Sequence, residues 1–202
     1  RDYQSSFGGI VLQEYSEKEQ KLVGPKVNIF KGTPVGVTEG PHLYRHDGWY
    51  YLMIAEGGTG PEHSISVARS RSLWQWFEGC PRNPIFTHRN LGMDYPVIYA
   101  GHGDLVDDGH GNWYVIMLAS RPCQKHCSMG RETFLAKVTW ESDWPVINAG
   151  VGHLEKNVEV PLEEVHFPEE YTEQDLFLFH EKTLDRRLVS IQTQNASQYS
   201  LE

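Results

Sequence analysis

The sequence predicts an all-β protein made of β-propeller blades. Three observations support this: a pattern of about 60 residues that occurs twice, many aromatic and turn-forming residues, and little helical periodicity. Aromatic residues make up 12% of the chain, which also has 19 Gly and 11 Pro. That composition is typical of short strands joined by turns. No window in residues 1–150 keeps apolar residues at the i, i+3, i+4, i+7 spacing of an amphipathic helix.

The repeated pattern is a Gly-led apolar stretch, a turn rich in Asp and Gly, and a Trp-Tyr-led apolar run. It occurs in Gly40–Ala55 and again in Gly101–Ala119, so that Trp49 and Trp113 are 64 residues apart. A repeat of this length, with three or four short strands, is typical of a propeller blade. A β-sandwich with two similar hairpins is the alternative.

The predicted strands follow one another along the chain. The first incomplete blade has Gly9–Tyr15 and Val27–Phe30, and residues 36–150 supply two further blades. Their later strands are Ser64–Ser70 and Glu132–Thr139, and Asn83–Phe86 is expected to correspond to Trp144–Ile147. We therefore expect about two and a half blades, fewer than the four or so that a closed ring needs.

The charge pattern predicts two parts, residues 1–150 with the blades and residues 151–202 as an acidic linker with a further segment. Residues 155–181 hold nine acidic side chains and one base, in a chain whose formal net charge is −9. The acidic balance argues against a nucleic-acid partner. No apolar run approaches the ~18 residues of a membrane span. No signal peptide is visible, which leaves cytoplasmic and secreted locations open.

Glu39 is the first candidate for chemistry. It precedes Gly40-Pro41 at the start of an expected inner strand. A carboxyl group desolvated in a central cleft has a raised pKa, which suits a general acid near neutral pH. A solvated turn glutamate is the alternative. The glycine-dense stretch Glu56–Gly60 is expected to be a loop at the mouth of the same cleft.

Two further candidates are a histidine and an arginine. His102 lies between two glycines at the corresponding inner-strand position, where an imidazole either orients a ligand or metal or is simply structural. Arg131 opens a strand that is apolar at alternate positions, and its guanidinium suits sugar hydroxyls or carboxylates. A structural pair with Glu132 or another acid is the alternative, and Arg121 is a lesser candidate. Asp104 is expected to anchor a turn or to accept backbone donors.

These residues belong to longer motifs. The segments are EGPHLYRHDGWYYLMIAEGGTGPEHSISVARS (39–70), NPIFTHR (83–89), GHGDLVDDGHGNWYVIMLASRP (101–122) and GRETFL (130–135). Over roughly residues 8–150 the chain resembles glycoside hydrolase family 43, in its β-xylosidase and α-L-arabinofuranosidase branch. The resemblance implies a five-bladed propeller, present here only in part, that hydrolyses glycosides with inversion.

The resemblance also implies a role for each candidate. Glu39 matches the general acid, Arg131 the arginine that contacts the sugar, and His63 a pocket histidine. His102 matches a central histidine near a calcium or sodium ion at the propeller axis. An inverting enzyme also needs a general base. Relatives carry that Asp in the first blade and a pKa-tuning Asp in the second, and no Asp of this chain matches either, which implies an N-terminally truncated catalytic propeller.

The expected function is hydrolysis of β-xylosides or α-L-arabinofuranosides in hemicellulose catabolism, with xylo- or arabino-oligosaccharides as partners. A catalytically incomplete remnant that at most binds carbohydrate is the alternative. Open blade edges predict self-association. Relatives of this branch often continue into a β-sandwich, and Phe177–His180 and Leu188–Gln192 are the expected first strands of such a domain.

Overall fold

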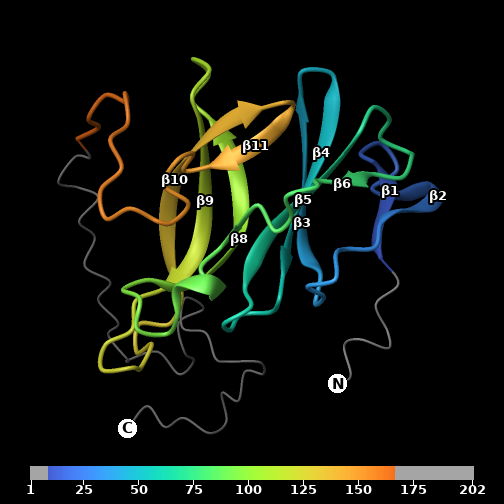
Figure 1. Ribbon diagram of the computed structural model, residues 1–202. Helices are drawn as coiled ribbons and strands as arrows, with labels where there is room; N and C mark the ends of the chain where they lie inside the picture. Colours follow the sequence, from blue (N-terminus) through green and yellow to red (C-terminus); the bar gives the residue numbers. More distant parts are fainter. Residues whose placement is uncertain (1–8, 167–202) are drawn as a thin grey trace, which may run out of the picture. The chain divides into compact units, whose positions relative to one another are not determined.

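The computed structural model describes residues 9–166, and almost all of their regular structure is antiparallel β-sheet. The strands form three separate sheets that follow one another along the chain (Figure 1). Within this range the only helix is the short 3₁₀ turn η1 (Arg89–Leu91). None of the described residues form a helix long and apolar enough to cross a membrane.

The three sheets have the connectivity of propeller blades. The first sheet pairs β1 (Ile10–Ser16) with β2 (Lys21–Phe30). The second has the order β3 (Glu39–His46), β4 (Trp49–Glu56), β5 (Ser64–Ser70) and β6 (Glu78–Gly79), with β7 (Phe86–Thr87) also paired to β5. The third has the order β11 (Trp144–Ile147), β10 (Glu132–Glu141), β9 (Trp113–Ser120) and β8 (Ile98–Asp107). Consecutive antiparallel strands in four-stranded sheets are propeller blades. The prediction of about two and a half blades is confirmed.

Local sequence explains the hairpins and the central strands. The β3–β4 hairpin turns at Asp47-Gly48, where φ is 44° and 75°. Positive φ at both central residues is the type I′ geometry that Asp-Gly favours. After the turn, β4 is buried at every residue from Tyr51 to Glu56. A strand covered on both faces needs such a continuous apolar run, because neighbouring sheets pack against each face.

The second and third blades share one hydrophobic core. Met53 and Ile65 of the second blade pack with Val115 and Met117 of the third. Between them runs β8, and its backbone passes so close that a Cβ on Gly103 would lie 2.6 Å from the Ile65 Cδ1 atom. A side chain larger than glycine at position 103 would therefore push the two sheets apart.

One predicted correspondence between the blades is confirmed only in part. Trp144–Ile147 is the fourth strand of the third blade. In the second blade two short strands pair with β5, β6 at one end and β7 at the other, so of residues 83–86 only Phe86 lies in a fourth strand. The Asn83 side chain instead bonds the Val67 backbone, accepting from its N–H at 2.9 Å and donating to its carbonyl at 2.8 Å. Pro84 follows without an N–H to donate, and pairing resumes after it, where the Ile85 N–H donates to the Ile65 carbonyl at 2.8 Å and Phe86 of β7 pairs with Ile65.

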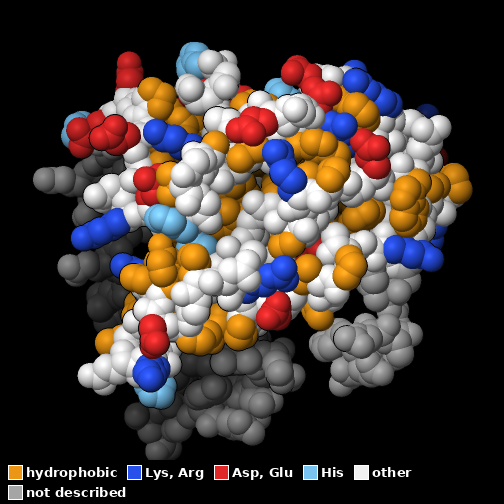
Figure 2. All heavy atoms as spheres, viewed as in Figure 1, with side chains coloured by type: hydrophobic (Ala, Val, Ile, Leu, Met, Phe, Trp, Pro, Cys, Tyr) orange, Lys and Arg blue, Asp and Glu red, His pale blue; other side chains and the backbone are white. Residues whose placement is uncertain are grey.

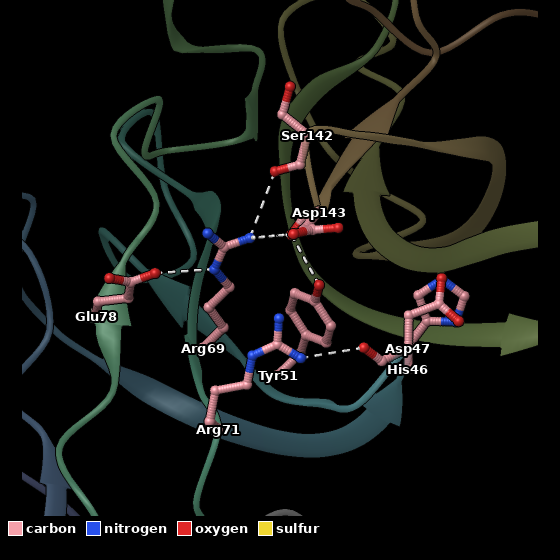
Figure 3. A network of polar contacts seen from close by, with 8 residues as sticks. All are labelled: His46, Asp47, Tyr51, Arg69, Arg71, Glu78, Ser142 and Asp143. Carbon is pink, nitrogen blue, oxygen red and sulfur yellow. Dashed lines mark hydrogen bonds and ion pairs between the residues drawn. The ribbon is translucent and has the colours of Figure 1, made fainter.

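A network around Arg69 joins the second blade to the β10–β11 turn of the third (Figure 3). The Arg69 guanidinium lies 4.1 Å from the ring centroid of Trp49 and 4.0 Å from that of Trp144. It donates to the Asp143 carbonyl at 2.6 Å, and the Tyr51 hydroxyl donates to the same oxygen at 2.7 Å. These contacts cross between blades, so Arg69 helps to fix their packing.

His88 makes a second connection, to the segment that follows β11. It is buried, and its Nδ1 lies 2.7 Å from the Val97 carbonyl, so that nitrogen carries the proton. Its Nε2 accepts the backbone N–H of Leu154 at 3.0 Å. Only a neutral imidazole can make both bonds at once. Burial lowers the pKa of His88, which favours that neutral form.

The first blade exposes apolar side chains. Val11, Tyr15 and Leu22 of β1 and β2 are 55%, 56% and 59% exposed. On the face seen in Figure 2, apolar, acidic and basic side chains are interspersed. The predicted self-association through open blade edges stays a prediction, for which these side chains are a chemical basis.

The sequence predicts a division of the chain into residues 1–150 and 151–202. By internal contacts the chain separates into units 1–159 and 160–202. The predicted boundary between residues 150 and 151 stays a prediction. The expected strands Phe177–His180 and Leu188–Gln192 lie outside the described residues.

The Arg69 network predicts a specific loss of stability. Arg69→Ala should lower the free energy of unfolding by about 2–4 kcal/mol, since it removes two ring contacts and a bond to a carbonyl. Arg71→Ala is the matched control, because Arg71 lies 3.7 Å from the Trp49 ring centroid but has a single bond, of 3.4 Å, to the Asp47 carbonyl. Urea unfolding measures both variants, and equal losses would contradict the role given to Arg69.

The buried His88 predicts a pH dependence. Its pKa in the folded chain lies below the value of about 6.5 in the unfolded chain. The folded state therefore binds fewer protons, and stability is full above pH 6.5 and falls as the pH is lowered through that value. His63, also buried with a lowered pKa, acts in the same direction.

Urea unfolding between pH 7.5 and 5 measures this slope. His88→Gln should reduce it, because an amide donates and accepts in the same way but does not titrate in this range. The same slope in His88→Gln and in the natural sequence would exclude His88 as its source.

Candidate active site

Glu39 is the first residue of β3 and lies opposite Ala55 of β4. Directly after it the ladder is interrupted, because the register shifts before His42 pairs with Met53. Gly40 has φ of 55°, a conformation that favours glycine, and Pro41 has no N–H to donate. This bulge ends regular pairing at the point where Glu39 projects, and the Glu39 side chain is exposed.

His102 lies on a similar bulge in β8. The register of β8 against β9 shifts on both sides of Gly101, and His102 itself has φ of 51°. Its ring packs on the bulge of β3, since a Cβ on Gly40 would lie 2.6 Å from His102 Nε2. The two irregular strand starts therefore face one another, and each places one predicted site residue.

His63 supports the same region from within. It precedes β5 and is only 2% exposed. Its Nδ1 lies 2.8 Å from the Tyr99 carbonyl, and a Cβ on Gly101 would lie 2.5 Å from its ring. Since a carbonyl only accepts, Nδ1 carries the proton. The imidazole thus holds β8 in place.

The other three predicted site residues all influence the pKa of His63. Burial lowers the pKa of His63, the bond to Tyr99 partly opposes this, and the charges of Arg131 and His102 lower it further while Glu39 raises it. All three charged or titratable groups thus lie close enough to act on this imidazole. The four residues predicted from the motifs share one region, and their individual roles stay predictions.

Arg131 is exposed and directly precedes β10. The alternative pairing with Glu132 does not occur, because Glu132 accepts from Arg121, with Nε at 3.0 Å and a second bond from the terminal nitrogen. That bond lowers the pKa of Glu132. Within residues 9–166 Arg131 has no ion pair, so its guanidinium is available to a ligand.

A polar group that the motifs did not indicate lies between the blades. The Tyr44 hydroxyl donates to the Asp104 carboxylate and accepts the Leu105 N–H at 2.9 Å, and His42 Nδ1 lies 3.5 Å from the same carboxylate. Burial raises the pKa of Tyr44, and the bond to Asp104 raises it further. The expectation that Asp104 anchors a turn or accepts backbone donors is wrong, since its acceptor role is toward a side chain 60 residues away.

The glycine-dense stretch 56–60 also differs from expectation. Glu56 is the last residue of β4 and is fully buried, with three hydrogen bonds to its carboxylate. The loop begins only after it. The buried part of β4 extends to Glu56, its last residue. Thr33 and Thr38, which donate hydrogen bonds to the Glu56 carboxylate, lie 23 and 18 residues earlier in the chain.

The predicted calcium or sodium ion finds little support in the donor set. Among the described residues no three His, Cys, Asp or Glu side chains gather in a way that could hold a metal. Calcium prefers six to eight oxygen ligands, and His102 offers a single imidazole. The residues described do not by themselves fit such an ion, and the metal role of His102 stays a prediction.

Comparisons with known proteins agree with this geometry. The sequence profile of glycosyl hydrolases family 43 matches residues 1–145. A xylosidase/arabinosidase of Butyrivibrio fibrisolvens is 59% identical over 194 residues, which are 95% of this chain and 38% of that protein. A beta-xylosidase of Bacillus subtilis (strain 168) is 41% identical over 184 residues, 85% of this chain and 34% of that protein.

A solved structure is similar in fold as well. The crystal structure of xylan beta-1,4-xylosidase from Bacillus halodurans C-125 superposes with a TM-score of 0.77 and 44% identity, covering 89% of this chain and 34% of that one. The chain thus spans about a third of the length of the relatives that it matches. Its blades correspond to part of a five-bladed propeller.

The close packing of His63 on β8 predicts that Gly101 is intolerant of a side chain. Gly101→Ala should lower the free energy of unfolding by about 1–3 kcal/mol, because its Cβ collides with the His63 ring. Gly60→Ala is the matched control: no atom lies within 4 Å of its added Cβ, and neither glycine has positive φ. The measurements are urea unfolding and the NMR shifts of the His63 ring, and an equal effect of both substitutions would contradict the packing.

Proposed function

The chain belongs to glycosyl hydrolases family 43, and on that premise we propose that it contributes the general acid and part of the sugar-binding wall of a glycosidase. The proposed substrates are β-xylosides or α-L-arabinofuranosides of hemicellulose. The observation that carries the proposal is the meeting of the β3 and β8 bulges, which bear Glu39 and His102, and the His63 ring packs on the same part of β8. The charge of Arg131 also acts on His63. Relatives named xylosidase/arabinosidase support the substrate class.

Glu39 is the proposed general acid. Its carboxyl group donates a proton to the glycosidic oxygen while the bond from that oxygen to the anomeric carbon breaks. The exposed position of Glu39 at a strand start supports this role, because a substrate can reach the side chain. In the inverting reaction a water attacks the anomeric carbon from the opposite face while a second carboxylate, acting as general base, takes its proton.

Arg131 and His102 are the proposed sugar-binding wall, and the buried His63 supports it from behind. Arg131 has no ion pair among the described residues and carries five N–H donors, which suit the hydroxyl groups of a pentose. His102 presents its ring beside the bulge that bears Glu39. His63 keeps its protonated Nδ1 on the Tyr99 carbonyl and packs on β8 behind the wall.

A matched pair of substitutions tests the acid. Glu39→Gln should lower the rate of hydrolysis of aryl β-xylosides and aryl α-L-arabinofuranosides by about 10²–10⁴-fold, because an amide cannot donate the proton. Glu14→Gln makes the same change of charge at an exposed residue of β1 and should leave the rate unchanged.

Two results would overturn the proposal. An unchanged rate in Glu39→Gln would remove Glu39 from the acid role. Saturable binding of xylose by folded protein that hydrolyses neither substrate would favour a carbohydrate-binding module instead.

A further inference from the structure

A fully buried carboxylate lies at the end of β4, next to the proposed acid. Glu56 has no ion pair within residues 9–166. Its Oε1 accepts the Thr33 N–H at 2.8 Å and the Thr38 hydroxyl at 2.8 Å, and its Oε2 accepts the Thr33 hydroxyl at 2.6 Å. Burial of a carboxylate costs free energy that such bonds offset. An apolar side chain packed in the same place would avoid the desolvation cost of a buried carboxylate. We therefore expect the Glu56 carboxylate itself to serve a function.

The three bonds fasten the segment that leads into β3. Thr33 and Thr38 lie near the two ends of the connection between β2 and β3. The Gly57 N–H donates to the Gly36 carbonyl at 2.9 Å, which adds a point of attachment between them. The connection is thus tied to the end of β4 at its start, its middle and its end.

The last of these ties lies beside Glu39. Thr38 is the residue directly before Glu39, and Glu39 lies opposite Ala55, the residue directly before Glu56. On the other side of Glu39 the ladder is interrupted by the bulge at Gly40 and Pro41. Since β3 begins at Glu39 and the bulge follows it, the ladder continues on neither side of the Glu39–Ala55 pair, and the Thr38–Glu56 bond supplies support on the side that precedes Glu39.

We infer that Glu56 is a positioning residue, which sets the backbone of the general acid through the Thr38 hydroxyl. The inference rests on the proposed function, since it gives Glu56 no role unless Glu39 donates the proton. An acid must lie within hydrogen-bond reach of the leaving oxygen, and a shift of about 1 Å can cost up to 10²-fold in rate. Glu56 touches neither substrate nor reacting atoms in this scheme.

The test removes the bond without uncovering the carboxylate. Thr38→Val keeps the shape of the side chain and loses the hydroxyl, while Thr33 still satisfies Glu56. Thr38→Ser restores the hydroxyl. Ser70→Ala is the control for loss of a buried hydroxyl, at the far end of β5. These variants avoid Glu56→Gln, which risks misfolding because it places an amide among hydrogen-bond donors.

The readout is the dependence of kcat on the leaving group. For xylobiose, whose alcohol leaves poorly and needs protonation, Thr38→Val should lower kcat about tenfold or more with little change in KM. For 2,4-dinitrophenyl β-xyloside, which leaves without protonation, kcat should change less than twofold. Thr38→Ser should recover most of the rate on xylobiose, and Ser70→Ala should leave both substrates unaffected. Glu39→Gln should show the same leaving-group dependence in a stronger form.

Each contrary result has one meaning. Equal losses on both substrates in Thr38→Val, or no loss, would overturn the positioning role while Glu39→Gln still supports the acid. A Glu39→Gln variant without leaving-group dependence would overturn the acid assignment and this inference with it.

Discussion

The close passage of β8 across the second blade is the constraint on which the rest of the structure depends. Gly101 and Gly103 bring its backbone against the His63 ring and the Ile65 side chain, at distances that no larger residue allows. The shared core of two blades forms because of this approach. The same approach carries His102 onto the bulge of β3. The close approach of the β8 backbone thus contributes both to the shared core and to the arrangement of the candidate site.

The candidate site occupies the places where regular pairing stops. In β3 the bulge follows Glu39, and in β8 register shifts lie on both sides of Gly101, directly before His102 in the sequence. Irregular strands project side chains in directions that a regular ladder does not allow. They also lose ladder bonds, and buried polar groups take over that support: Glu56 holds the approach to β3, and Tyr99 bonds His63 beside β8. The candidate site and the interrupted strand pairing therefore share one location, which side-chain hydrogen bonds support.

Much of this was predictable from the sequence. The Asp47-Gly48 turn and the alternation of apolar runs with turns predicted the blades, because these signals act over a few residues. The repeat predicted that Gly40 and Gly101 would occupy equivalent strands. The motifs around Glu39 and Arg131 indicated the family, and the match over residues 1–145 confirmed it. One blade correspondence was confirmed only in part, since Asn83 bonds the Val67 backbone through its side chain and only Phe86 of residues 83–86 joins a strand.

What the sequence by itself determined is therefore local: strands, turns, repeat and the types of residue at the site. Only the tertiary structure decided which groups are partners. Glu132 takes Arg121 and leaves Arg131 unpaired within the described residues. Tyr44 reaches a carboxylate 60 residues away in the next blade. Such choices depend on how closely distant segments approach, and that distance is set by packing between sheets, which no short window of sequence contains.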